Sequence, residues 1–282
     1  MIRNLLSILI LLFYASLNAQ QLEKSLLWKI SGKGLEKASY LFGTIHATCD
    51  ASLDENVKMA MKNTSQLYLE IDIDDPSMQS SMMAQINMKD NTKVSDLVSK
   101  KDFVIVDKFI QVNVGVPLQT LNTVKPFFIS AMLLPKLLDC PMQSIEEELI
   151  KISTAQNEET FGLETIEQQI EIFDAIPYKD QVEELVKMAK DNMQKDKEEF
   201  QQLLEIYKSK DINAMLENTE NELYSKFDNE LLTNRNQNWI PIIQKIVTSK
   251  ATFIGVGAAH LAGENGVIKL LRKQGYKVEA VK

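Results

Sequence analysis

Apolar residues form short runs near both ends of the chain and follow a helical spacing in the middle. Two runs near the start, Leu26–Ile30 and Ala38–Phe42, flank a Gly-Lys-Gly turn, which predicts an opening β-hairpin. Near the other end, Thr252–Val256 and Tyr276–Val281 predict two more strands, and residues 266–273 predict a helix between them. Both ends of the chain therefore supply strands.

The segment after the hairpin predicts a βαβ unit. Ser52 can cap a helix, Glu55 lies three positions later to complete a capping box, and the helical pattern ends near Asn63. Residues 66–72 then have the apolar content of a strand. A strand, helix and strand at this spacing are predicted to bring parallel strands together as neighbours.

The middle of the chain is predicted to be helical apart from one short strand at Thr160–Glu164. Prolines 177 and 241 predict a break and a kink or interruption. The helical stretches are 76–151, 168–224 and 220–246. Since no low-complexity linker divides the chain, the sequence predicts one domain over residues 20–282. We expect an α/β fold, with a central mixed sheet, βαβ elements from the chain ends and a large helical insertion.

The first residues have the pattern of a secretory signal. Arg3 supplies a positive charge, Leu5–Tyr14 an apolar run and Ser16–Ala19 a small-residue end. The sequence therefore predicts a signal peptide over residues 1–19, cleaved after Ala19. We expect an exported protein, in the periplasm, in the outer envelope or secreted, with no membrane span after the signal is removed.

The net charge bears on the binding partners of the protein, and the two cysteines bear on a disulfide. The net charge is −8, and an acidic chain with dispersed lysines is a poor nucleic-acid binder. The two cysteines, Cys49 and Cys140, can form one disulfide in an exported protein. Free thiols are a second interpretation, and metal ligation by Cys49, three residues after His46, is a third.

Both histidines of the chain end the same short pattern. His46 closes Gly43-Thr-Ile-His46, His260 closes Gly257-Ala-Ala-His260, and each motif follows a strand-like run. Imidazole is a general base near neutral pH and a common metal ligand. We interpret the pair as parts of one site, the alternative being two separate core histidines at strand ends. The glycines fit positions where the backbone approaches a neighbour closely.

Carboxylates and one arginine extend this candidate site. Glu70 lies near the end of the strand after His46, so the two are expected on neighbouring strand ends, and His260 should open onto the same edge. Two histidines and one carboxylate can hold a divalent metal. Glu164 is either a second site carboxylate or a helix N-terminal acid, and Arg235 either binds a substrate anion or lies on the surface. The acidic run at residues 146–148 is expected to be a solvated helix face.

Other catalytic motifs are missing from the sequence. The chain has no Gly-x-Ser-x-Gly, no His-Glu-x-x-His, no Gly-x-x-x-x-Gly-Lys and no Cys-x-x-Cys. These absences disfavour the serine-nucleophile, zincin and nucleotide-binding classes.

The chain resembles the TraB/GumN family, which includes the TIKI metalloproteases. The matching blocks are Tyr40–His46, Leu67–Asp72, Phe161–Gln169, Arg235–Trp239, Phe253–Gly263 and Gly275–Val278. In that family, the two Gly-x-x-His motifs and the Glu after the second core strand are taken as the active site. They correspond to His46, His260 and Glu70. The family's Arg-Asn block corresponds to Arg235, and its Leu-Glu-Thr block to Glu164.

The resemblance implies a divalent-metal hydrolase that acts on peptide bonds, with manganese or cobalt favoured over zinc. His46, Glu70 and His260 would hold the metal and its water. Glu70 or Glu164 would shuttle the proton, and Arg235 would hold a substrate carboxylate or an oxyanion.

Two other functions stay open. The family is distantly similar to the erythromycin esterases, where a similar His/Glu set is thought to activate water without a metal. This similarity implies a metal-independent hydrolase of ester or amide bonds. Other family members shut down peptide pheromones, which implies a non-catalytic protein that sequesters peptides.

Overall fold

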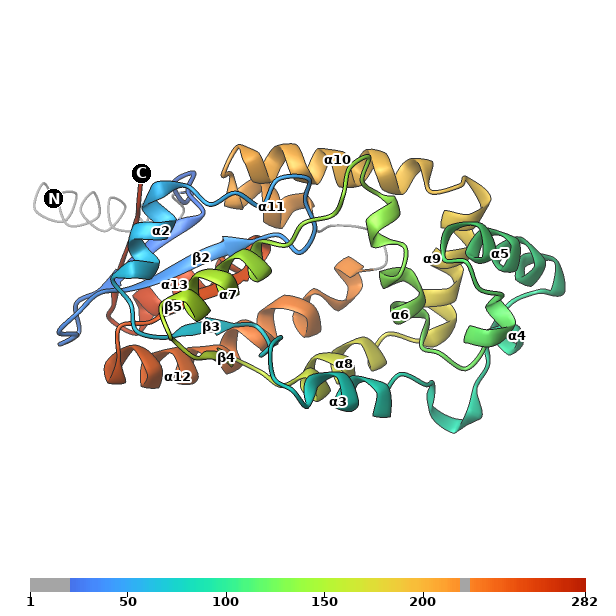
Figure 1. The fold of residues 1–282 in the computed structure, drawn as a ribbon, viewed down its shortest axis with the longest axis horizontal. Helices are drawn as coiled ribbons and strands as arrows, with labels where there is room; N and C mark the ends of the chain where they lie inside the picture. The colour runs from blue at the N-terminus through green and yellow to red at the C-terminus, as the bar shows by residue number, and fades with distance from the viewer. Residues whose placement is uncertain (1–20, 219–223) are drawn as a thin grey trace, which may run out of the picture.

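The structure is a computed structural model that describes residues 21–218 and 224–282. The predicted signal segment and its cleavage after Ala19 lie outside the described residues. A β-sheet with covering helices forms one end of the molecule, and helices from the middle of the chain form the other (Figure 1). No helix in the described ranges has the length and apolar content to cross a bilayer.

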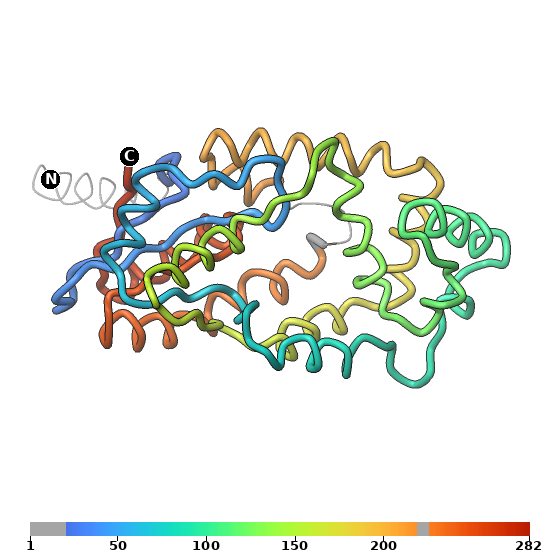
Figure 2. Tube along the Cα trace, viewed as in Figure 1, coloured from blue at the N-terminus to red at the C-terminus, as the bar shows by residue number. Residues whose placement is uncertain are grey.

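The sheet is mixed and six-stranded, in the order β4-β3-β5-β2-β1-β6. Its strands are β1 (Leu27–Ser31), β2 (Ser39–Thr44), β3 (Leu67–Leu69), β4 (Thr160–Gly162), β5 (Phe253–Gly257) and β6 (Lys277–Ala280). Strands β4, β3, β5 and β2 are parallel, and β1 is antiparallel to both β2 and β6. The predicted α/β class and opening hairpin are confirmed. The C-terminal segment runs back beside the first strands (Figure 2).

The prediction that β2 and β3 are direct neighbours is wrong, because β5 lies between them. Strand β5 suits this central place since Phe253, Ile254 and Val256 are completely buried on both faces of the sheet. A Cβ added to Gly255 would lie 2.9 Å from a methyl group of Leu69. A strand from late in the sequence therefore joins the two halves of the sheet.

Two crossover connections place helices on opposite faces of the sheet. The chain passes from β2 through α2 (Glu55–Lys62) to β3 in one direction, and from β5 through α13 (Val267–Lys273) to β6 in the other. Crossovers of the same hand that run in opposite directions cover opposite faces. Helix α7 (Ile145–Ala155) packs beside α2, and α12 (Asn234–Ser249) packs beside α13 (Figure 1).

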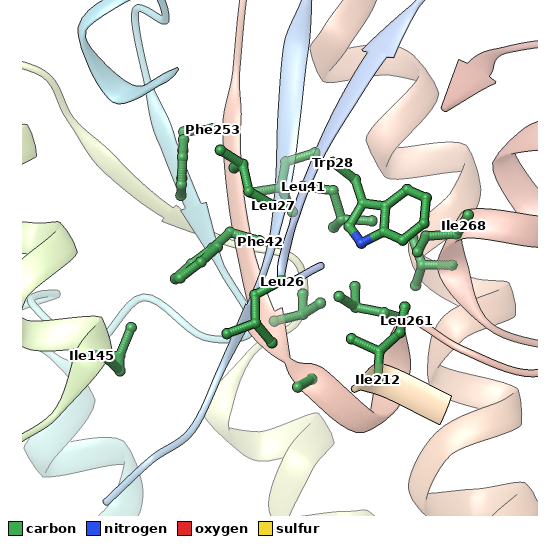
Figure 3. Packing of buried hydrophobic residues seen from close by; sticks show 14 of the residues in the cluster. Leu26, Leu27, Trp28, Leu41, Phe42, Ile145, Ile212, Phe253, Leu261 and Ile268 are labelled. Atoms are coloured by element: carbon green, nitrogen blue, oxygen red, sulfur yellow. The ribbon is translucent and has the colours of Figure 1, made fainter. Parts of the chain in front are cut away.

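The main hydrophobic core fills both sides of the sheet. Figure 3 shows Phe42 on the side of Ile145 from α7, and Trp28 on the side of Ile268 from α13. Trp28 and Ile268 are almost completely buried, as expected for a sheet whose two faces are both covered by helices.

Helix α2 begins at a different cap from the one predicted. Asp54, not Ser52, is the N-cap, and its carboxylate accepts from the amide of Val57 at 3.0 Å. The C-cap is Asn63, as predicted. Asp54 also pairs with Lys210 at 2.9 Å, so a residue from the turn between α10 and α11 supports this choice of cap.

The helical insertion has a hydrophobic core of its own. Val106 and Ile110 of α5 pack there with Val182 and Leu185 of α9. The helices and turns before β4 are α3 (Met78–Ala84), η2 (Lys89–Asn91), α4 (Val94–Leu97), α5 (Lys100–Asn113), η3 (Leu118–Leu121), α6 (Pro126–Ala131) and η4 (Leu134–Lys136). Those after β4 are α8 (Ile166–Asp174), α9 (Tyr178–Lys190), α10 (Gln194–Lys208) and α11 (Ile212–Asn218).

Breaks in the long helical stretch explain how the chain turns around this second core. The predicted break at Pro177 is confirmed, since Pro177 is the N-cap of α9. The helical stretch is broken at two further points, each of which contains a residue with left-handed backbone. Met193 at φ 62° lies between α9 and α10, and Lys210 at φ 58° lies between α10 and α11. After η5 (Tyr224–Phe227) and the π-helical turn η6 (Asn229–Thr233), α12 continues through Pro241 without interruption. The predicted helix start at Glu220 lies outside the described residues.

Cys49 and Cys140 form a disulfide, the first of the three sequence interpretations. Their Cα atoms are 5.7 Å apart. Thr48 and Gln143 pair in an antiparallel bridge next to it. The loop that follows β2 is therefore fastened to the segment that leads into α7.

Candidate functional site

Four chemistry-bearing residues follow the four parallel strands at their shared carboxyl edge. Glu164 follows β4, Glu70 follows β3, His260 follows β5 and His46 follows β2. The prediction that parallel strand ends share one edge is confirmed. Because β5 is central, the strand of His260 lies between those of Glu70 and His46.

Arg235, in the first turn of α12, joins three of these residues into a buried cluster. Its Nη2 donates to Glu70 Oε2 at 2.5 Å and to Glu164 Oε1 at 2.6 Å. Its Nε donates to the same Glu164 carboxylate, and its Nη1 lies 3.0 Å from His260 Nε2 and 3.2 Å from the carbonyl oxygen of Leu231. These contacts use all five N–H donors of the guanidinium group.

The cluster fixes the charge of each member. Burial alone raises the pKa of the Glu70 carboxyl, but the charge of Arg235, the two histidines and the backbone N–H of Gly257 together outweigh burial and hold this pKa well below its usual range. Burial alone lowers the pKa of Arg235, and the charges and hydrogen bonds of Glu70 and Glu164 together reverse that effect and raise it. Glu70 also accepts the backbone N–H of Gly257 at 2.7 Å. Glu70 and Arg235 are thus a buried ion pair at neutral pH.

His260 is held in one neutral tautomer. Arginine can only donate, so Nε2 of His260 accepts from Arg235, and Nδ1 carries the proton that it donates to Asn236 Oδ1 at 2.7 Å. Burial lowers the pKa of His260 to about 3 against the opposing charge of Glu70. The ring of Trp239 packs 4.6 Å from the imidazole, centre to centre. Both ring nitrogens of His260 are therefore occupied.

His46 lies apart from this cluster and has a partner that the sequence did not predict. Its Nδ1 is 2.8 Å from Oε1 of Glu146, whose other oxygen accepts from Ser144 Oγ at 2.9 Å. The His46 side chain is 67% exposed, whereas that of Glu146 is 7% exposed. Loss of hydration lowers the pKa of His46, and the hydrogen bond and charge of Glu146 together with the charge of Glu70 more than offset this, so the pKa rises to about 9.

The expectation that the acidic run at residues 146–148 is a solvated helix face is wrong for Glu146. Ile145, Leu149 and Ser153 form the buried face of α7, and Glu146 lies on that face while Glu147 is exposed. The apolar spacing of α7 could have placed Glu146 inward. What the spacing could not supply is the partner, which comes from a loop about 100 residues earlier.

The other overlooked residues lie on one face of α12. Asn236 bonds to His260 through Oδ1 and to the carbonyl oxygen of Asn265 through Nδ2. Trp239 Nε1 donates to Glu164 Oε2 at 3.2 Å. Trp239 lies four positions after Arg235 and three after Asn236, which is the spacing of neighbours on a helix surface and was a usable signal.

The glycines of both Gly-x-x-His motifs lie at close backbone contacts, as the sequence indicated. A Cβ on Gly43 would lie 2.9 Å from Leu261 Cδ1 and 3.1 Å from Ala258 Cα. A Cβ on Gly257 would lie 3.2 Å from Glu70 Oε1, the atom that accepts this residue's own N–H. The two motifs therefore pack against each other and against the cluster.

The expected metal ligands do not fit a metal in this arrangement. Within residues 21–218 and 224–282, no three His, Cys, Asp or Glu side chains are grouped so that they could hold an ion. Arg235 binds the Nε2 of His260 and the Oε2 of Glu70, and Glu146 binds the Nδ1 of His46. The disulfide removes Cys49 as a further ligand.

A cavity of about 560 Å³ adjoins the cluster at its Glu164 end. Glu164, Arg235 and Trp239 belong to both the cluster and the cavity wall. The rest of the wall comes from Leu163 after β4, from α8 and the residue that follows it, and from η6 and α12. Such a hollow beside buried charged groups is the usual form of a ligand site.

Fold and site together define an α/β protein with a buried His/Glu/Arg cluster at the carboxyl edge of its parallel strands. The sequence pattern of the TraB/PrgY/gumN family matches residues 26–280, and the chain belongs to that family. This confirms the resemblance noted from the sequence. No curated protein and no solved structure matches the chain.

Proposed function

We propose that the protein is a hydrolase that cleaves peptide bonds, or related amide and ester bonds, at the carboxyl edge of its sheet. The observation that carries the proposal is the pairing of His46 with Glu146. A buried carboxylate fixes Nδ1 at 2.8 Å, while the ring is 67% exposed and Nε2 has no hydrogen-bond partner among the described residues. This arrangement leaves one imidazole nitrogen oriented and free to exchange protons.

In the proposed reaction, Nε2 of neutral His46 takes a proton from a water molecule as the water oxygen attacks the carbonyl carbon. The proton then passes from Nε2 to the leaving nitrogen or oxygen as the C–N or C–O bond breaks, and His46 returns to its neutral form. Glu146 stabilises the imidazolium that exists between the two transfers. With a pKa of about 9, the reactive neutral form becomes more abundant as the pH rises towards 9.

The buried cluster supports this role by position and charge. Because all five donors of Arg235 are used, Arg235 acts as a positioning residue and not as the substrate-binding group expected from the sequence. It lowers the pKa of Glu70 and so keeps that carboxylate ionised. The negative charge of Glu70 in turn favours the imidazolium form of His46.

The proposal routes no step through a metal, because the donor atoms of the expected ligand set are already bound to Arg235 and Glu146. Its test is turnover of a library of fluorogenic peptides and aryl esters, with and without EDTA. Wild-type protein should turn over at least one substrate, with the same rate in EDTA. His46→Gln should lose at least 100-fold in kcat/KM, as expected for loss of a general base.

Two outcomes would overturn the proposal. Turnover that EDTA abolishes and manganese restores would replace it with the metal-dependent peptidase. Tight peptide binding without turnover of any library member would replace it with the peptide-sequestering protein. The matched control is Glu147→Gln, an exposed neighbour of Glu146, which should leave kcat/KM unchanged.

A further inference from the structure

Two helices contribute apolar side chains to the cavity beside the charged cluster. One is α8, which contributes Ile172, and the other is α12, which contributes Trp239 and Ile242. These apolar side chains form walls, while carboxylates from three different segments also line the space. The cavity therefore offers a surface for an apolar stem together with acceptors for a polar end.

The cavity has two carboxylates, those of Glu171 and Glu230, that have no ion-pair partner among the described residues. Glu164, Glu171 and Glu230 line it, and Arg235 is the one cationic side chain among its lining residues. Arg235 has no donor left, because its five N–H groups bind Glu70, Glu164, His260 and Leu231. Within the described chain, Glu171 and Glu230 form no ion pair. A positively charged group in the cavity would be the first partner of both.

The lining and position of the cavity suit a long cationic side chain. Lysine and arginine carry an apolar stem and a charged head, and they bury the stem while the head binds acceptors. Glu164, Arg235 and Trp239 form the wall that the cavity shares with the cluster. A side chain bound there would bring its peptide backbone next to the carboxyl edge, where the strand ends present the cluster and His46.

We propose that this cavity is a specificity pocket that binds a lysine or arginine side chain of a peptide substrate, with Glu171 and Glu230 as its charge acceptors. The inference rests on the proposed hydrolase for the meaning of "substrate", but binding in the pocket is measured without turnover. Anionic and neutral side chains of the same length bind less well, since they leave both carboxylates without a partner.

The test uses three blocked peptides, acetyl-Ala-Ala-X-Ala-Ala-amide, in which X is lysine, norleucine or glutamate. X carries the only charge, and norleucine keeps the stem of lysine. Dissociation constants are measured by calorimetry on the wild-type protein. The lysine peptide should bind at least tenfold more tightly than the norleucine peptide, the glutamate peptide most weakly, and the lysine preference should shrink at 0.5 M salt.

Variants locate the preference in the pocket. Glu171→Gln and Glu230→Gln should each weaken binding of the lysine peptide by about three- to tenfold and leave the norleucine peptide unchanged. Glu205→Gln, on the exposed face of α10, makes the same change of charge away from the pocket and should have no effect. Equal binding of the lysine and norleucine peptides, or a preference that survives the double variant, would overturn the inference.

The outcome also separates this inference from the proposed function. Lysine-selective binding without cleavage of any peptide would refute the hydrolase and support the pocket. Cleavage of library peptides with no preference for a basic residue would support the hydrolase and refute the pocket.

Discussion

His46 and Glu146 are 100 positions apart in the sequence, yet Nδ1 of the first lies 2.8 Å from Oε1 of the second. The Cys49–Cys140 disulfide and the Thr48–Gln143 bridge join the two segments that carry them. The pair is thus held by a covalent link and by main-chain hydrogen bonds outside the sheet. Its geometry depends on this link between the loop after β2 and the segment that leads into α7.

Glu146→Gln should lower the pKa of His46 from about 9, because the amide keeps the shape of the side chain but loses the charge that favours imidazolium. NMR titration of the ring protons measures this directly, and the chain has only two histidines to assign. In the wild type, the pair stabilises the fold fully below pH 6.5, and that contribution is lost as the pH rises towards 9. Glu147→Gln is the matched control. An unchanged His46 titration in Glu146→Gln would refute the pairing.

His260 should titrate at about pH 3, far below His46, since burial penalises its charged form. Its lowered pKa has the opposite linkage to that of His46: the stability it contributes is present above pH 6.5 and is lost as the pH falls towards 3. Asn236→Asp adds a negative charge at Nδ1 and should raise the pKa of His260. The same NMR experiment decides this, and a His260 titration near 6.5 in the wild type would contradict the buried neutral form.

Arg235→Met should destabilise the protein by about 3–5 kcal/mol, because it leaves the buried carboxylates of Glu70 and Glu164 without their cation. The free energy of unfolding in urea measures the loss. Adding Glu70→Gln and Glu164→Gln to that variant should recover part of it, since the unpaired charges are removed. If the triple variant is no more stable than Arg235→Met, the ion pairs are not the cause.

Removing the disulfide by Cys49→Ser with Cys140→Ser should cost about 2–4 kcal/mol of unfolding free energy, as is typical for a bond that closes a long loop. The pKa of His46 should also fall, because the loop that holds it against Glu146 becomes looser. Urea unfolding and the NMR titration give the two readouts. A stable double variant with an unchanged His46 pKa would show that the Thr48–Gln143 bridge suffices.

Local patterns predicted the elements that carry the site, and long-range packing decided how they meet. The strand-like runs before His46 and His260 and around Glu70 predicted which residues reach the carboxyl edge. The place of β5 between β2 and β3 could not be predicted, because spacing along the chain does not encode the order of parallel strands.

The partners of the site residues were the hardest part to predict. Glu146 shares its acidic run with Glu147 and Glu148, and only the packing of α7 distinguishes them. The spacing around Arg235 favours a surface arginine, and it cannot show that three segments bring Glu70, Glu164 and His260 within reach of one guanidinium group. Ser and Asp are both good N-cap residues, so the sequence alone does not decide between Ser52 and Asp54. Asp54, which caps α2 in the structure, also forms an ion pair with Lys210.

The central place of β5 has a consequence for how the protein acquires its structure. Strands β2 and β3 are synthesised early, but they do not pair with each other. Each pairs instead with β5, which begins at Phe253. The edge strand β6 arrives later still and pairs with β1. The β1–β2 hairpin and the β3–β4 pair can form earlier, but they cannot join into one sheet until β5 has left the ribosome. Since such distant pairings pay their loop-closure entropy first, the sheet is expected to form slowly, after the helices.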